Sequence, residues 1–146
     1  MSLRLLAESD EDLKVISAAL QDAVVKLGDI HYEPAARRLT LACNRFRWEA
    51  AMRKRGGRGG ERVRSALQLS GVLKVQARGL KRGAPEALVC LLAVNFEPSG
   101  AEEDPSGVVV LHFAGNADLR VEVECLDAAL ADVSAPWPTP RRPGHD

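Results

Sequence analysis

The stretch RVRSALQLSGVLKVQARG, residues 62–79, decides the fold, because apolar and polar side chains alternate through much of it on both sides of Gly71. Alternation with a period of two is typical of a β-strand with one buried face. The two halves therefore predict strands over residues 62–69 and 73–79. Residues that pair across two strands point to the same face, which requires a three-residue loop, residues 70–72, and predicts an antiparallel hairpin.

The register of this hairpin places like charges opposite each other on its outer face. Leu69 opposes Leu73 on the inner face, so Arg64 opposes Arg78 on the outer face, beside Lys74. Like charges directly across a sheet are destabilising by up to about 1 kcal/mol. A bound anion would relieve that repulsion, and the register therefore predicts a basic sheet face that attracts anions.

The period of two continues along most of the chain after Gly28, in runs separated by Gly, Pro, Asn and Asp. It predicts about seven strands, of which the other five cover residues 23–30, 39–48, 88–96, 108–114 and 118–124. The run LVCLLAVNF, residues 88–96, is apolar on both faces. This pattern predicts a central strand, and the N-terminal helix is its expected cover.

Helical spacing is found near both ends of the chain. Ser9 and the three acidic residues after it are typical of a helix start. Apolar residues recur at helical spacing from Leu13, which predicts an amphipathic helix that ends before Gly28 and overlaps the strand predicted from residue 23. A second amphipathic helix, stopped by Pro136, is predicted by the i, i+3, i+4, i+7 spacing of Leu126, Ala129, Leu130 and Val133.

Together these elements predict an α+β fold in one domain, residues 1–133, followed by a proline-rich tail, residues 134–146. The domain is expected to contain an N-terminal helix, about seven mostly antiparallel strands that form a barrel or sandwich, and a C-terminal helix. In element order, residues 23–133 resemble the pleckstrin-homology superfold. Many unrelated functions share that scaffold, so a pleckstrin-homology-like architecture implies no particular activity.

A resemblance to a known family is carried by two segments, DLKVISAALQDAV (residues 12–24) and NRFRWE (residues 44–49). They resemble an uncharacterised proteobacterial domain-of-unknown-function family, and the similarity runs over most of the chain. The resemblance implies a bacterial cytosolic protein. It implies no activity, cofactor or catalytic residue, because none is established for that family.

Charge is segregated along the sequence although the chain as a whole is neutral, with 20 basic and 20 acidic residues. Residues 35–82 contain fourteen basic and two acidic residues, a net charge of +12, and the rest of the chain carries −12. Such asymmetry indicates an anionic partner without identifying it.

The sharpest candidate site is the glycine-rich basic loop MRKRGGRGGERVR, residues 52–64, together with the neighbouring sheet face. Arginine forks hold phosphate oxygens, and arginine–glycine segments bind single-stranded nucleic acid. We therefore predict a non-enzymatic module that binds a polyanion, with RNA as the preferred partner. The predicted ligand-binding residues are Arg53, Lys54, Arg55, Arg58, Arg62, Arg64, Lys74 and Arg78. The alternative interpretation of the loop is a solvated connection without a ligand.

The segment RFRW, residues 45–48, alternates arginine with aromatic residues. One pair must face the core and the other the solvent. Aromatic side chains are the ones usually buried. Phe46 and Trp48 are therefore expected in the core, with Arg45 and Arg47 in solvent as further candidates for the basic face.

Three other classes of function stay open. The first is a protein-interaction or self-association module whose basic face docks an acidic surface. An enzyme that acts on a phosphorylated small molecule would need a pocket beside His31 or His112, and the sequence contains no catalytic motif, metal-ligand spacing or cofactor fingerprint. Acidic membrane lipid is a further candidate partner, although charge alone gives weak binding.

Cysteine content and hydropathy bear on the compartment. Cys43, Cys90 and Cys125 are odd in number and lie within or beside apolar runs, which favours buried free thiols in a reducing cytosol. No apolar run approaches the length of about 20 residues that spans a bilayer. A cytoplasmic location is therefore expected.

Overall fold

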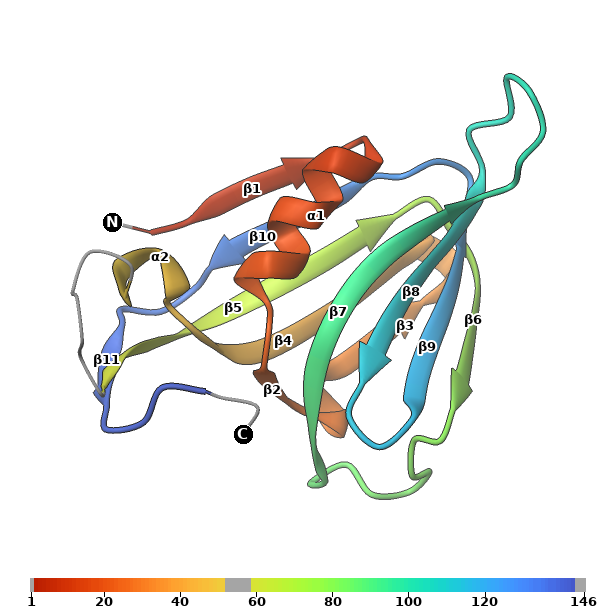
Figure 1. The fold of residues 1–146 in the computed structure, drawn as a ribbon. Coiled ribbons are helices and arrows are strands. Elements are labelled where there is room, and N and C mark those ends of the chain that lie inside the picture. The colour runs from red at the N-terminus through yellow and green to blue at the C-terminus, as the bar shows by residue number, and fades with distance from the viewer. Residues whose placement is uncertain (1, 52–58, 144–146) are drawn as a thin grey trace.

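The computed structural model describes residues 2–51 and 59–143, in which eleven strands form one antiparallel sheet (Figure 1). Two α-helices are described, α1 (Asp10–Ala19) and α2 (Trp48–Ala51), and two short 3-10 turns cover Leu27–Asp29 and Pro34–Ala36. The strands are β1 (Arg4–Ala7), β2 (Ala23–Lys26), β3 (Ile30–Glu33), β4 (Arg38–Phe46), β5 (Gly60–Ser70), β6 (Val72–Arg78), β7 (Leu88–Pro98), β8 (Gly107–Phe113), β9 (Ala117–Val123), β10 (Ala128–Asp132) and β11 (Trp137–Thr139).

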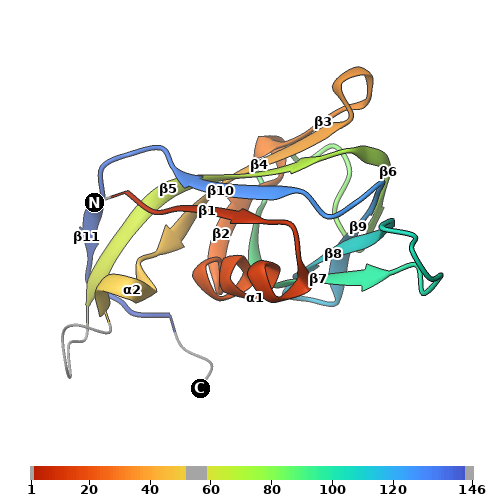
Figure 2. The same ribbon diagram turned by 90° about the horizontal axis from the view of Figure 1, so that it is seen from above.

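The sheet is strongly bent but open. Its strand order is β1-β10-β5-β4-β2-β7-β8-β9-β6, with β11 added to β5 and β3 added to β4. The first and last strands of this path, β1 and β6, do not pair with each other among the described residues, so the sheet does not close into a barrel. The view from above shows α1 lying beside β1 and β7 (Figure 2).

The expected fold class is wrong in two respects. The structure is a large antiparallel sheet rather than an α+β barrel or sandwich, and residues 128–132 form β10 instead of a C-terminal helix. The pleckstrin-homology element order, which ends in a helix, is therefore not observed. Leu130 lies fully buried between Leu5 and Leu67 of the two flanking strands. Pairing with β1 and β5 satisfies the backbone groups on both edges of β10 and places Leu130 in the core.

The predicted hairpin is also wrong, although both of its strands form. β5 pairs with β4 and β10, whereas β6 pairs with β9. Gly71, with a φ of 68°, lies where the chain passes from one half of the sheet to the other. Leu69 opposes Leu39 and Ala128 rather than Leu73, because both edges of β5 are already occupied by other strands.

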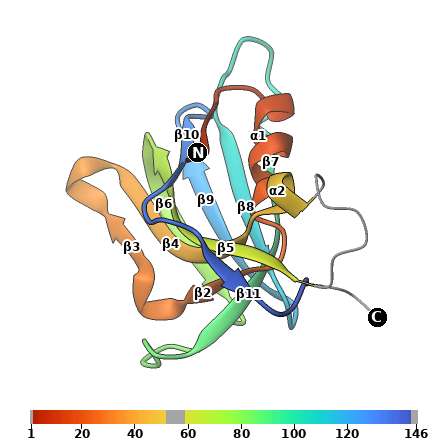
Figure 3. The same cartoon turned by 90° about the vertical axis from the view of Figure 1, so that its left-hand side faces the viewer.

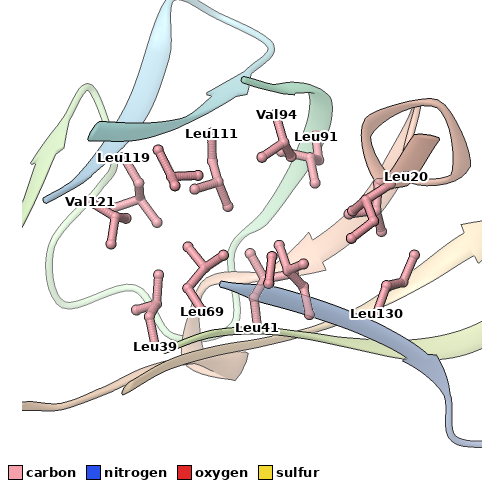
Figure 4. Packing of buried hydrophobic residues seen from close by; sticks show 14 of the residues in the cluster. Leu20, Leu39, Leu41, Leu69, Leu91, Val94, Leu111, Leu119, Val121 and Leu130 are labelled. Atoms are coloured by element: carbon pink, nitrogen blue, oxygen red, sulfur yellow. The ribbon is translucent and has the colours of Figure 1, made fainter. Parts of the chain in front are cut away.

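Aliphatic side chains from the two halves of the bent sheet meet in the core (Figure 4). Leu39, Leu41 and Leu69 lie on one side, and Leu111 and Leu119 lie on the other. The helix α1 adds two buried side chains, Leu13 and Ile16, and its C-cap residue Leu20 adds a third.

The predicted helix start is confirmed. The Ser9 hydroxyl accepts a hydrogen bond of 3.2 Å from the Asp12 backbone N–H. The helix ends earlier than expected, at Ala19, and Asp22 adopts a φ of 64° before β2 begins. β2 forms where helix and strand predictions overlapped, because it fits between β4 and β7 and pairs with both.

The central position predicted for residues 88–96 is confirmed in β7. This strand lies between β2 and β8, and the Val94 backbone N–H donates to the Ser17 hydroxyl of α1 at 2.9 Å. Leu88 and Leu92 are nevertheless exposed, so the cover is incomplete at the beginning of the strand.

The three cysteines differ in their surroundings. All three are free; Cys43 is buried, Cys90 is half-buried and Cys125 is exposed, so the expectation of three buried thiols is wrong for Cys125. Burial raises the pKa of the Cys43 thiol to about 12, which keeps it protonated and unreactive near neutral pH.

Candidate functional site

The charges that are segregated in the sequence are interleaved in the fold. Six described arginines of residues 35–82 form ion pairs, mostly with carboxylates from outside that segment. The pairs are Arg37–Glu124, Arg38–Glu33, Arg45–Asp132, Arg47–Glu61, Arg64–Asp29 and Arg78–Asp118. Much of the +12 charge is therefore neutralised by neighbouring carboxylates. The candidates for binding an anion are the cations that have no carboxylate partner.

One end of the sheet holds such cations next to an exposed aromatic residue. β11 pairs with the start of β5, which sets Trp137 directly opposite Arg62 and Thr139 opposite Gly60. Arg141 and Arg142 follow β11 and are exposed. We call Arg62, Trp137, Arg141 and Arg142 the arginine–tryptophan surface. Figure 3 looks onto this end of the molecule, with β11 in the foreground.

Within the described residues, the three arginines of this surface have no carboxylate partner. Among residues 2–51 and 59–143, the Arg62 side chain donates to the Asn44 backbone carbonyl alone, at 3.2 Å. Trp137 retains 37% of its accessible area, whereas Phe46 is fully buried. The arginine–tryptophan surface therefore combines unneutralised positive charge with an accessible aromatic ring.

Two glycines allow the strands at this end to approach closely. A Cβ on Gly60 would lie 2.5 Å from the Phe46 ring, and one on Gly59 would lie 2.7 Å from the Thr139 carbonyl oxygen. Glycine is required at both places because no Cβ fits. At residues 59 and 60 the glycines thus serve tight packing, and they hold Pro140, just before Arg141, against the start of β5.

A buried polar cluster fixes the strands behind this surface. The Arg45 side chain is fully buried and donates to both carboxylate oxygens of Asp132, at 3.0 Å each, and to both of Glu49, at 2.8 and 3.0 Å. The Ser65 hydroxyl donates to Asp132 at 2.7 Å, and the Leu3 backbone N–H donates to it at 2.8 Å. One guanidinium thereby joins β4, β10 and α2. The expectation that Arg45 faces solvent is wrong.

Both carboxylates of this cluster have lowered pKa values. Burial raises the pKa of Glu49 and of Asp132, but the hydrogen bonds and positive charge of Arg45 outweigh burial and hold both pKa values below their usual range. Burial lowers the pKa of Arg45, but its bonds to the two carboxylates outweigh that effect and raise it.

Acidification should therefore destabilise the fold through this cluster. A carboxylate whose pKa is lower in the folded state contributes stability that is complete above its unfolded value and lost as the pH falls through the folded value. The ordinary values are 4.5 for Glu49 and 3.8 for Asp132. We expect the urea midpoint to fall as the pH drops below about 4.5, and to fall less in an Arg45→Met variant. An Arg120→Gln variant is the control and should show the same pH dependence of the urea midpoint as the wild type. An equal pH dependence in Arg45→Met and in the wild type would contradict this assignment.

The predicted site residues are divided among several places. Arg53, Lys54, Arg55 and Arg58 lie outside the described residues. Arg62 belongs to the arginine–tryptophan surface, and Arg64 donates to Asp29 at 2.8 Å and to the Asn44 side-chain oxygen at 3.1 Å. Lys74 and Arg78 lie on β6 opposite Glu122 and Asp118 of β9, so they do not adjoin Arg64 as the predicted hairpin required.

Comparison with known sequences identifies the family. The sequence matches the family described as a protein of unknown function (DUF2948) over residues 3–145. The chain belongs to the DUF2948 family. This confirms the resemblance to a domain-of-unknown-function family. Neither the curated proteins nor the solved structures contain a match to this chain.

Sequence reasoning missed three of the four residues of the arginine–tryptophan surface in this DUF2948 protein. Trp137, Arg141 and Arg142 lie in the segment interpreted as a proline-rich tail. The available signal was the sequence WPTPRR, residues 137–142, in which an aromatic residue precedes two arginines. Its proximity to Arg62 depends on the β5–β11 pairing, which no local pattern predicts.

The described part of this DUF2948 chain contains neither a membrane-spanning helix nor a cluster of metal ligands. No helix there is long and apolar enough to cross a membrane. No three His, Cys, Asp or Glu side chains of residues 2–51 and 59–143 gather as metal ligands would. His31 is exposed on β3, whereas His112 lines a pocket of about 500 Å³.

Proposed function

We propose that this DUF2948 protein is a non-enzymatic binding module that holds single-stranded RNA on the arginine–tryptophan surface. The observation that carries the proposal is the cross-strand juxtaposition of Trp137 with Arg62, with the exposed Arg141 and Arg142 following β11 in the chain. Single-stranded nucleic acids are bound by cations that follow the phosphates and by aromatic rings on which bases stack. Both chemical features are available together at this end of the sheet.

The distribution of charge supports this choice of site over the sheet face. On the outer face of β6 and β9, Lys74 and Arg78 stand opposite acidic residues. A polyanion would meet both signs of charge there. At the arginine–tryptophan surface the described cations have no carboxylate partner. The basic residues Arg53, Lys54, Arg55 and Arg58 precede Gly59 in the sequence and would add to the same positive charge.

The test is a fluorescence-anisotropy titration of labelled single-stranded RNA from low to physiological salt. An Arg62→Glu/Arg141→Glu/Arg142→Glu variant removes three cations. Each phosphate contact on a single strand contributes about 0.7 to the slope of log affinity against log salt, so we expect a slope shallower by about 2. Reversal of Arg53, Lys54, Arg55 and Arg58 should reduce the slope by about 3.

Replacement of Trp137 should affect binding differently. Stacking on an aromatic side chain contributes about 1–3 kcal/mol per base, so Trp137→Ala should weaken binding by about 5- to 150-fold with an unchanged salt slope. In a Trp48→Phe background the remaining tryptophan fluorescence should be quenched by RNA.

The matched control is Lys14→Glu/Lys26→Glu/Lys81→Glu, which makes the same charge change at exposed lysines elsewhere. It should retain the wild-type affinity to a large extent. An equal loss of RNA affinity in both triple variants would show that net charge alone causes the effect, and would overturn the proposed site. Absence of binding at low salt would overturn the RNA proposal, and a molar mass that rises with concentration in light scattering would then favour self-association.

A further inference from the structure

A row of three polar side chains crosses the sheet at the end of β6. Arg78 of β6 and His112 of β8 are both direct cross-strand partners of Asp118 of β9. Direct partners share a face of the sheet, so the three side chains lie side by side on the outer face. They line a pocket of about 500 Å³ whose wall also includes Leu92, Phe113 and Asn116.

Asp118 is the unusual member of this row. Its side chain is 93% buried, and its Oδ2 accepts a hydrogen bond from Arg78 at 2.5 Å. Its Oδ1 is fully buried and has no hydrogen-bond partner among the described residues. A buried acceptor without a partner costs about 1–3 kcal/mol, and such groups in folded proteins call for an explanation.

The other two side chains have unused hydrogen-bonding capacity. Toward the described residues Arg78 donates through one terminal nitrogen, and its side chain is 78% exposed. His112 Nε2 lies 2.5 Å from the Asn95 side-chain oxygen, an acceptor, so the geometry fits the tautomer in which Nε2 donates and Nδ1 accepts. The pocket therefore offers acceptors at Asp118 and His112 beside a donor fork at Arg78.

This combination selects among ligand classes. A simple anion is not favoured, because Asp118 already neutralises Arg78. A hard metal cation such as Ca²⁺ takes six to eight oxygen ligands, more than this wall supplies. A zwitterion satisfies both halves, since an ammonium group donates to several acceptors and a carboxylate accepts from an arginine fork.

We propose that this pocket binds a small zwitterion of the α-amino acid type, with its ammonium group at Asp118 and His112 and its carboxylate at Arg78. Leu92, which is 37% exposed, would contact an apolar ligand side chain. The site is independent of the arginine–tryptophan surface and does not require RNA binding.

The experiment is a titration of ¹⁵N-labelled protein with L-leucine, L-valine and L-phenylalanine, followed by NMR. We expect saturable shifts of backbone amides in residues 112–118. N-acetyl-L-leucine lacks the ammonium group and L-leucinamide lacks the carboxylate. Each loses a hydrogen bond to a charged group and should bind at least about tenfold more weakly than leucine.

Three variants locate the binding. Asp118→Asn keeps the shape of the carboxylate without its charge, and Arg78→Gln removes the exposed fork; each should weaken leucine binding by about tenfold or more. Arg120→Gln is the control and should bind leucine like the wild type. Arg120 lies on β9, as Asp118 does, and pairs with Glu97 instead of Asp118. Absence of saturable shifts with all three amino acids, or wild-type affinity in Arg78→Gln, would overturn the proposal even if Asp118→Asn fails to fold.

Discussion

Replacement of Arg45 with methionine is expected to lower the free energy of unfolding by about 3–5 kcal/mol, because it leaves a buried carboxylate without its counter-charge. The side chain of Asp132 is only 2% exposed and depends on Arg45 for two of its hydrogen bonds. Urea denaturation followed by the fluorescence of Trp48 and Trp137 measures the loss. Arg38→Met breaks an exposed ion pair and should cost less than about 1 kcal/mol.

A double variant separates lost charge from lost packing. Exchange of a buried ion pair for apolar residues is often neutral, so Arg45→Met/Asp132→Leu should recover part of the stability lost in the single variant. Similar losses in Arg45→Met and Arg38→Met would contradict the buried cluster. If the double variant is less stable than Arg45→Met, the loss of stability comes from packing and backbone contacts and not from the unpaired charge.

Replacement of Leu130 with alanine is expected to cost about 2–5 kcal/mol, because Leu130 is fully buried in the core and truncation leaves a cavity. Val133 is 61% exposed, so Val133→Ala should change the stability by no more than about 0.5 kcal/mol. A helix over residues 126–133 would place both side chains on one buried face and make both replacements costly. The ratio of the two losses in urea denaturation therefore distinguishes the strand from the helix.

Residues 126–133 show why the last element could not be predicted locally. Their apolar residues match helical spacing, and Leu126 and Leu130 are indeed buried. Within β10, however, Ala128 and Leu130 face the core with a period of two. The choice between the two periods was made by β1 and β5, which flank this strand on both edges.

The candidate site was predictable only in part. Local sequence was enough to select Arg62 as a basic residue beside a glycine-rich loop. It was misleading for Arg45, which is buried because Asp132 and Glu49 neutralise it inside the fold. It also missed Trp137, which reaches the site through pairing with a strand far away in the sequence.

Alternation and capping located the start of α1 and most of the seven predicted strands, because both signals depend on neighbouring residues along the chain. The strand predicted over residues 23–30 is wrong at residues 27–29, which form a 3-10 turn, and β1, β3, β10 and β11 were not predicted. Long-range contacts decided which strands pair, whether residues 128–132 form a strand or a helix, and which charges are neutralised. Each edge of a strand accepts whichever distant segment best satisfies its backbone groups and its core face. For that reason β5 pairs with β4, β10 and β11 rather than with the β6 that directly follows it.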